Sequence, residues 1–351
     1  MDVFCLNTEL VQLIRDEIRA RGPQPFAWFM QQALYHPQHG YYARGHATIG
    51  RHGDYFTNVS VGPLFGQLLT AQFAEIWECL GKACPECSRR IDQFIIVEQG
   101  THDGAFARDV LNCARQRFPE FLPALRYRII EPFPAWQGRQ SQTLGAFRDT
   151  VQWTETVTPF VGVHFSNELL DALPVNLRGK RVDLAGEEFV FVEYADEPET
   201  KLNQAALDWI DNVAANLQRG GVIAIDYGFT RSLFRESLQV RAQHRHLTSP
   251  FEQIGHADIT MHVNWTDIAE RAEAKGLHIA GFTDQHHFLT GIISQFPEIA
   301  DTAKAKRELQ TLLHPEMLGR AFQVLALSKD VDADQLCGFK FARDPRIALE
   351  L

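Results

Sequence analysis

Acidic side chains stand at the ends of four short apolar segments of this chain, and carboxylates there could do chemistry. Glu98 ends QFIIVE, Glu131 lies at the end of RYRIIEP, and Glu168 ends FVGVHFSNE. The fourth segment, GGVIAIDYG, closes with Asp226 and the two residues after it. A carboxylate can accept hydrogen bonds from ligand hydroxyl groups, balance a cation, or take up a proton. Such chemistry requires that these acids be brought to one place.

The apolar segments themselves predict the strands that would gather the acids. They are short and rich in β-branched residues, as strands covered on both faces of a sheet must be. The expected strands are 93–98, 126–132, 160–168, 220–228, 277–284 and 320–328, with helices at 106–118, 135–144 and 203–218. This alternation is typical of an α/β fold with a parallel sheet and helices on both faces. The carboxyl ends of parallel strands form one rim, where ligands collect.

A glycine turn follows the first expected strand and opens a helix, which is a common way to present backbone N–H groups to a ligand. It reads EQGTHDG, with glycines only at 100 and 104. A phosphate-binding loop of the Walker type would need a lysine here, and the spacing matches a dinucleotide fingerprint poorly. S-adenosylmethionine carries no phosphate, so this turn would suffice for it. Glu98 would then suit its cationic amino group and Glu131 its ribose hydroxyls. In the competing interpretation, the glycines only relieve a strand–helix corner and Glu131 is a solvated strand end.

Polar residues also crowd the end of the third expected strand, where the chain reads SNELLDALP. Asn167 offers both a hydrogen-bond donor and an acceptor. Glu168 and Asp171 are three residues apart, so they would share one face if this stretch were helical. With Asp226 at the end of the fourth strand, they complete a set of acids at the predicted rim.

The rest of the chain predicts additions to this sheet. Residues 1–90 form an expected N-terminal helical extension, and 91–330 the expected sheet domain. Residues 174–200 interrupt the alternation and predict a small antiparallel β insertion. Residues 331–351 are expected to form a C-terminal tail.

Composition excludes some classes of function and predicts a cellular location. The formal net charge of -10 disfavours sequence-independent binding of nucleic acid, and it suits a small molecule or a basic protein segment. No secretory leader or apolar run long enough to span a membrane is visible, and the acidic N-terminus argues against an import peptide. Cys84 and Cys87 form a single CxxC without a second pair, so no metal site is expected. Free thiols in a reducing cytoplasm are the expectation.

Several of these segments together resemble one family. GDYFT (53–57), SNELLDALPV (166–175), IDYG (225–228), DITMHVNW (258–265) and HPEMLGRAFQVLAL (314–327) are similar, in the same order, to the motifs of the MidA-like methyltransferases. That family includes bacterial members and a mitochondrial assembly factor for respiratory complex I. The resemblance covers nearly the whole chain.

The resemblance implies a Rossmann-like class I methyltransferase sheet that binds S-adenosylmethionine and methylates a protein arginine. It also implies that the loop 41–58 covers the site. The cofactor-binding positions expected by carry-over are Asp54, Thr57, Glu98, Gly100, Thr101, Gly104, Glu131 and Asn167. The catalytic positions expected are Glu168, Asp171 and Asp226.

The glycine turn departs from the family pattern at one position. The family carries ExGxGxG, whereas His102 stands here in place of the middle glycine. A side chain at that position is expected to crowd the cofactor or to shift the turn, because glycine is used where backbone must approach closely. Asp103 is expected to help fix the turn through its own side chain.

Methyl transfer to an arginine suggests roles for the acids. A guanidinium is cationic and holds its proton firmly, so a carboxylate pair could hold it and offset the charge as nitrogen is substituted. Glu168 and Asp171 are the expected pair, with Asp226 as the alternate. The expected partner is a protein substrate, either a respiratory-complex subunit or another basic segment, and the N-terminal helices could form a homodimer. A non-catalytic cofactor-binding assembly factor and a small-molecule methyltransferase are the alternatives.

Overall fold

The computed structural model describes residues 8–43, 57–82, 91–195, 202–243, 245–333 and 335–351. The chain forms two compact units. The first comprises Met1–Phe56, Asp171–Asp208 and Arg235–His262. The second comprises Thr57–Leu170, Trp209–Phe234 and Val263–Leu351. The helix that precedes the sheet and the C-terminal residues therefore belong to the same unit as the sheet.

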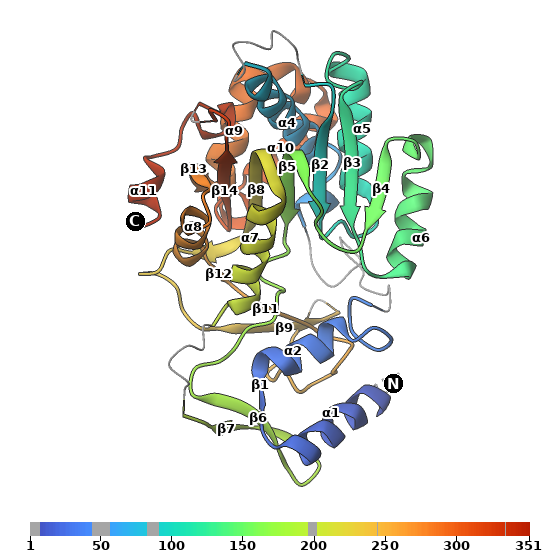
Figure 1. Cartoon of the computed structure of the whole chain (residues 1–351), viewed down its shortest axis with the longest axis vertical. Coiled ribbons are helices and arrows are strands. Elements are labelled where there is room, and N and C mark those ends of the chain that lie inside the picture. The colour runs from blue at the N-terminus through green and yellow to red at the C-terminus, as the bar shows by residue number, and fades with distance from the viewer. Residues whose placement is uncertain (1–7, 44–56, 83–90, 196–201, 244, 334) are drawn as a thin grey trace. The chain divides into compact units, whose positions relative to one another are not determined.

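Among the described residues, the second unit holds an eight-stranded sheet. Its main path runs in the order β13-β14-β8-β5-β2-β3-β4, and the short β12 pairs with β8 (Figure 1). The strands are β2 (Phe94–Gln99), β3 (Leu125–Ile130), β4 (Val151–Thr154), β5 (Phe160–Asn167), β8 (Leu217–Phe229), β12 (Val263–Asn264), β13 (His278–Asp284) and β14 (Phe322–Lys329). All pairs from β4 across to β8 are parallel, whereas β14 is antiparallel to both of its neighbours. This is the Rossmann-like class I sheet that the sequence predicted.

Helices alternate with the strands and complete the second unit (Figure 1). They are α3 (Asn58–Val61), α4 (Leu64–Lys82), α5 (Ala105–Arg117), α6 (Pro134–Thr143), α8 (Trp265–Ala274), α9 (Gln285–Gln295), α10 (Ala303–Leu313) and α11 (Pro345–Ala348). The boundary between the units falls inside α7 (Gln204–Asn216). Short one-turn elements lie at Gly145–Phe147, Pro297–Ala300, Pro315–Gly319 and Cys337–Phe339.

Both faces of β5 are covered, which explains the apolar character of the parallel strands. Phe165 packs against Phe73 of α4 and Phe106 of α5, with ring centroids 5.6 and 4.5 Å apart. The neighbouring His164 is fully buried, and its ring lies 5.5 Å from that of Trp209 in α7. Because successive side chains of a strand point to opposite faces, α4 and α5 cover one face and α7 the other.

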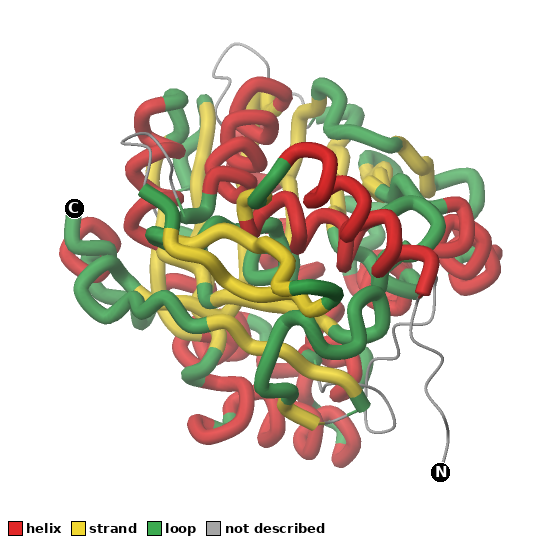
Figure 2. The backbone as a smooth tube through the Cα atoms, turned by 90° about the horizontal axis from the view of Figure 1, so that it is seen from below, coloured by secondary structure: helices red, strands yellow, loops and turns green. Residues whose placement is uncertain are grey.

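In its described part, the first unit combines two helices with two small sheets. The helices are α1 (Thr8–Arg21) and α2 (Phe26–Tyr35). One sheet contains β1 (Gln24–Pro25), β6 (Lys180–Ala185) and β7 (Glu188–Glu193), and the other contains β9 (Leu238–Ala242), β10 (Arg245–His246) and β11 (Asp258–Met261). Helix α1 runs beside the β6–β7 hairpin (Figure 2), where Arg15 forms an ion pair with Glu187. The hairpin is the antiparallel insertion expected from the sequence.

Order along the sheet identifies where a ligand should bind. β2 pairs with β3 on one side and with β5 on the other. The chain proceeds outward from β2 through β3 to β4, then returns to β5 and continues toward β8. In open α/β sheets, ligands bind outside the carboxyl ends of the strands at the point where this direction reverses. That point lies at the end of β2, where the glycine turn begins.

Candidate functional site

The turn after β2 contains three residues with left-handed backbone. Gly100, His102 and Gly104 have φ of 87°, 51° and 85°. A Cβ atom on Gly104 would lie 3.4 Å from the Cα of Gln140 in α6, so glycine allows α5 to begin close to α6. His102 adopts the backbone that the family's middle glycine would adopt easily. A left-handed residue with a side chain costs about 1 kcal/mol.

The side chain of His102 is accommodated beside the turn. Its ring lies 4.5 Å from the ring of Trp136 in α6, and its Nδ1 is 3.6 Å from Oδ1 of Asp103. Asp103 also accepts a hydrogen bond of 3.0 Å from the backbone N–H of Ala105, as its expected turn-fixing role requires. The two outer glycines and His102 thus all have left-handed backbone, and the effect of His102 on the cofactor stays a prediction.

Glu131 directly follows β3, and its carboxylate is buried. Oε1 accepts a hydrogen bond of 3.0 Å from the N–H of Phe133, and Oε2 accepts one of 3.0 Å from Nε2 of Gln140. Burial raises the pKa of Glu131, and these hydrogen bonds oppose the shift. Each carboxylate oxygen has a second lone pair, so Glu131 can still accept from a ligand. Its burial excludes the competing interpretation of a solvated strand end.

Glu98 has a different environment, inside β2. It is buried, and Oε2 accepts a hydrogen bond of 2.5 Å from the hydroxyl group of Tyr127. Burial raises the pKa of Glu98 to about 8, partly opposed by the hydrogen bond from Tyr127. Thr101 is itself buried at the start of the turn. Glu98 therefore lies beneath the turn and is protonated over part of the neutral range.

Asp226 holds backbone at the end of β5. Its Oδ2 accepts hydrogen bonds from the N–H groups of Leu169 and Leu170, at 3.0 and 2.7 Å, and its Oδ1 accepts one of 2.8 Å from the N–H of Tyr227. The residue is almost completely buried. A carboxylate used in this way fixes the chain, and the expectation that Asp226 contacts a methyl acceptor stays a prediction.

Glu168 and Asp171 do not share a helix face, because the chain bends after β5 and no helix forms at 168–174. Glu168 has a left-handed φ of 54°, and its Oε1 accepts a hydrogen bond of 2.9 Å from Nδ2 of Asn167. Asp171 begins the next segment of the first unit, is buried, and accepts a hydrogen bond at its carbonyl from the N–H of Met261. The unit boundary therefore separates these two acids.

Thr57 is the first residue of the second unit. The Thr57 side chain caps α3 through Ser60, in a reciprocal capping box. The next residue, Asn58, is fully buried and donates from Nδ2 to Oδ1 of Asn167 at 2.9 Å. Sequence reasoning missed Asn58, although it follows the GDYFT segment directly. Asp54 and most of the expected covering loop lie outside the described residues, as do Cys84 and Cys87.

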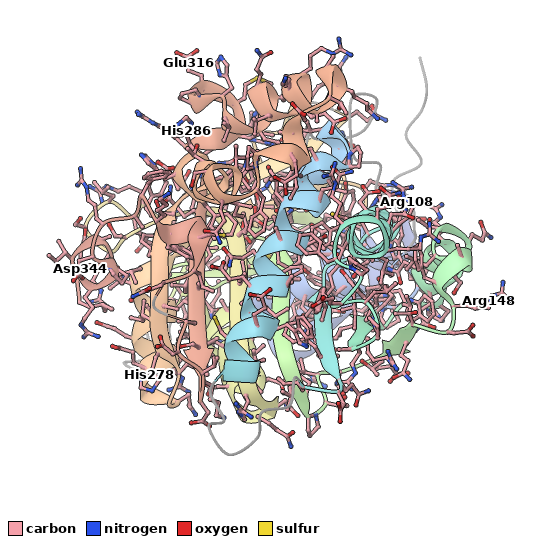
Figure 3. All side chains as sticks on the ribbon, turned by 90° about the horizontal axis from the view of Figure 1, so that it is seen from above. Arg108, Arg148, His278, His286, Glu316 and Asp344 are labelled. Atoms are coloured by element: carbon pink, nitrogen blue, oxygen red, sulfur yellow. The ribbon has the colours of Figure 1, made fainter. Side chains whose placement is uncertain are left out.

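Two further histidine-containing segments belong to α9 and β10. His286 and His287 are in the first turn of α9, which Asp284 caps through the N–H of His287. Figure 3 shows the labelled His286 well away from the labelled Arg108 of α5. Arg245 and His246 form the short strand β10.

Known proteins similar to this chain indicate its family and its cofactor. Residues 68–198 and 180–283 match a family model described as "Putative S-adenosyl-L-methionine-dependent methyltransferase". A solved structure from Burkholderia thailandensis, bound to S-adenosyl-homocysteine, is 26% identical, has a TM-score of 0.85, and covers 97% of each chain. The residues described here fit such a cofactor, because the turn brings backbone to the end of β2 and Glu131 retains acceptor capacity beside it.

Curated relatives add a protein name and a compartment. The mitochondrial protein arginine methyltransferase NDUFAF7 homolog of Drosophila melanogaster is 24% identical and covers 93% of this chain and 86% of its own length. The Mus musculus NDUFAF7 is 23% identical over 91% of this chain and 84% of its own. Both are mitochondrial by name, so the expected cytoplasmic location is wrong and the relatives point to mitochondria instead. Among the described residues, no helix is both long enough and apolar enough to cross a membrane.

The matched model spans more than half of the chain, and its relatives share the fold over nearly the whole length. The cofactor is S-adenosylmethionine, as the bound S-adenosyl-homocysteine of the structural relative indicates. This chain belongs to the MidA-like family of S-adenosylmethionine-dependent methyltransferases.

Proposed function

We propose that this enzyme transfers the methyl group of S-adenosylmethionine to an arginine side chain of a protein. The observation that carries the proposal is the likeness, over 93% of this chain, to a relative named as a protein arginine methyltransferase. The net charge of -10 suits a basic protein segment as the partner, although whole-chain charge acts mainly on encounter.

The cofactor is placed in this proposal at the end of β2. The turn from Gly100 to Gly104 would follow the adenosine and methionine parts, and Glu131 would accept the ribose hydroxyl groups. Two observations support the placement: β2 is the strand at which the sheet order reverses, and Glu131 follows the adjacent strand with acceptor capacity left. Asn167 ends β5 on the other side of β2.

Glu168 is the proposed acceptor-contacting acid of the second unit. It follows β5, and its left-handed backbone is unusual for a residue with a long side chain. Such strained residues concentrate at functional sites, where the surrounding structure holds them in place. In-line methyl transfer needs chiefly alignment, and a carboxylate there would orient the guanidinium and offset its charge. Asp171 is retained as a second acid whose role is tested separately.

The proposal is tested by methyl transfer from labelled S-adenosylmethionine to proteins of a mitochondrial extract, followed by mass spectrometry of methylated arginines. Glu168→Gln should lower the rate about 10²-fold, as expected when a positioned acidic group is lost. Asp171→Asn should do the same if that carboxylate also serves the acceptor. Affinity for S-adenosylmethionine should remain nearly constant in both variants.

Asp92→Asn is the matched control, because Asp92 is an exposed acid that precedes β2. It should leave the rate unchanged. Label found only in small molecules, or on protein residues other than arginine, would contradict the proposed acceptor. A Glu168→Gln variant that transfers methyl groups at the normal rate would remove Glu168 from the reaction.

A further inference from the structure

One buried amide, that of Gln140 in α6, connects the two parts of the proposed cofactor site. The side chain is fully buried. Its Nε2 donates a hydrogen bond of 2.8 Å to the carbonyl oxygen of His102 and one of 3.0 Å to Oε2 of Glu131. Its Oε1 accepts a hydrogen bond of 2.9 Å from Nε1 of Trp153 in β4. The amide therefore has a partner at each of its two polar ends.

The orientation of this amide is determined by its partners. The indole nitrogen of Trp153 can only donate, so it must face the amide oxygen. The carbonyl of His102 and the carboxylate of Glu131 can only accept, so both must face the amide nitrogen. A flipped amide would place its oxygen against the two acceptors and its N–H groups against the indole N–H. Burying such unsatisfied polar groups is costly. Trp153 thus fixes which end of Gln140 faces the site.

The hydrogen bond from Gln140 to the His102 carbonyl holds the strained part of the turn. His102 is the residue with left-handed backbone at the position where the family carries glycine. A hydrogen bond to its carbonyl holds that peptide group, and the ring of Trp136, one helical turn before Gln140, lies against the histidine ring. Helix α6 therefore holds the turn at two points, and one of them is the amide that also holds Glu131.

We propose that Gln140 is a positioning residue for S-adenosylmethionine: it sets the distance between the glycine turn and the Glu131 carboxylate, so that both meet the cofactor together. This inference rests on the cofactor placement proposed above. It predicts that binding depends on the Gln140 amide although this amide is buried behind the groups that would touch the ligand.

Another glutamine of the same helix provides a matched control. Gln137 donates from Nε2 to the backbone carbonyl of Glu131 at 2.7 Å. This hydrogen bond goes to the same residue that Gln140 contacts, but to its backbone and not to its carboxylate or to the turn. Replacing each glutamine by methionine keeps length and removes the amide. A purely structural role for α6 would give the two variants similar effects on binding.

Isothermal titration with S-adenosylmethionine tests the proposal. Gln140→Met should raise the dissociation constant about tenfold or more, the effect of losing a hydrogen bond to a charged group. Gln137→Met should change it less than about threefold. Trp153→Phe, which removes only the orienting donor, should raise it severalfold, and it remains informative if Gln140→Met does not fold. Equal dissociation constants for the wild type, Gln140→Met and Trp153→Phe would overturn the proposal.

Gln140→Glu adds a readout that packing alone would not change. When protonated, the new carboxyl group can donate to Glu131; when ionised, it repels that carboxylate. The ratio of its dissociation constant to that of the wild type should therefore rise as pH increases from about 6 to about 9, through the titration of the coupled pair. A ratio independent of pH would contradict the link between Gln140 and Glu131.

Failure of the cofactor placement would look different from failure of this inference. If Glu131→Ala binds S-adenosylmethionine as the wild type does, the placement beside Glu131 is wrong. If Glu131→Ala weakens binding while Gln140→Met and Trp153→Phe do not, the placement stands and the positioning role of Gln140 is wrong.

Discussion

Glu131 and Asp226 are both buried acids at the carboxyl-terminal part of parallel strands, yet their hydrogen bonds differ. Asp226 accepts from three backbone N–H groups, two of them in the segment after β5. Glu131 accepts from one backbone N–H group and from the side chain of Gln140. The first carboxylate accepts three hydrogen bonds from the backbone, whereas the second accepts two and has more acceptor capacity left for a ligand.

This difference shows that an acid at the end of a strand can have either a structural role or a ligand-binding role. The direction of the backbone after the strand decides whether N–H groups surround the carboxylate. After β5 the backbone N–H groups of Leu169 and Leu170 donate to Asp226 of β8. After β3 it enters α6, whose Gln140 side chain supplies the contact. The comparison predicts that changing Asp226 affects stability first and that changing Glu131 affects ligand binding first.

Asp226→Asn should have the largest effect. The amide places an N–H group where one carboxylate oxygen now accepts, so at least one buried backbone donor loses its partner. We expect the free energy of unfolding to fall by about 3 kcal/mol, the upper range for hydrogen bonds to a charged group. Chemical denaturation measures this. A stable Asp226→Asn variant that has lost methyl transfer would instead make Asp226 an acid of the reaction.

Glu131→Ala tests the other side of the comparison. Loss of the carboxylate should weaken S-adenosylmethionine binding by about 2 kcal/mol, as expected for charged hydrogen bonds to a ligand. The free energy of unfolding should change less than in Asp226→Asn. Titration calorimetry and denaturation on the same preparations compare the two effects. The opposite order, with stability lost and binding kept, would break the distinction between the two acids.

Glu98 extends the comparison to an acid inside a strand. Burial raises its pKa from 4.5 to about 8. Because the folded state binds this proton more tightly, the group contributes stability below about pH 4.5 that is lost as pH rises toward 8. Glu98→Gln should flatten the fall in unfolding free energy across this window by up to about 1.4 kcal/mol per pH unit. Denaturation at several pH values shows the change, and identical pH profiles would contradict the buried, protonated state.

The smallest effect is expected at His102. His102→Gly removes the left-handed strain of about 1 kcal/mol but also the ring contact with Trp136, which is of similar size. The unfolding free energy should therefore change by less than about 0.5 kcal/mol, and cofactor affinity by less than about threefold. His102→Ala loses the ring contact and keeps the strain, so it should be less stable than His102→Gly. The reverse order would mean that the turn is unstrained.

Local patterns predicted most of the second unit. Strands β2, β3, β5 and β8 could be predicted because strands buried on both faces are continuous runs of apolar residues. The turn could be predicted because left-handed backbone favours glycine. Strand β4 was missed, since VQWT is short and its pairing with β3 depends on residues far along the chain. The residues of β14 likewise do not predict that this strand lies antiparallel between β8 and β13.

For the site, the sequence by itself determined which residue types were available: a turn with glycines at 100 and 104, and acids near the ends of successive strands. Only the tertiary structure decided their uses. It surrounded Asp226 with backbone amides, joined Glu131 to His102 through Gln140, and placed Glu168 and Asp171 in different units. The physical reason is that strand and turn formation depend on neighbours in sequence, whereas the role of a polar group depends on which donors and acceptors the folded chain brings to it.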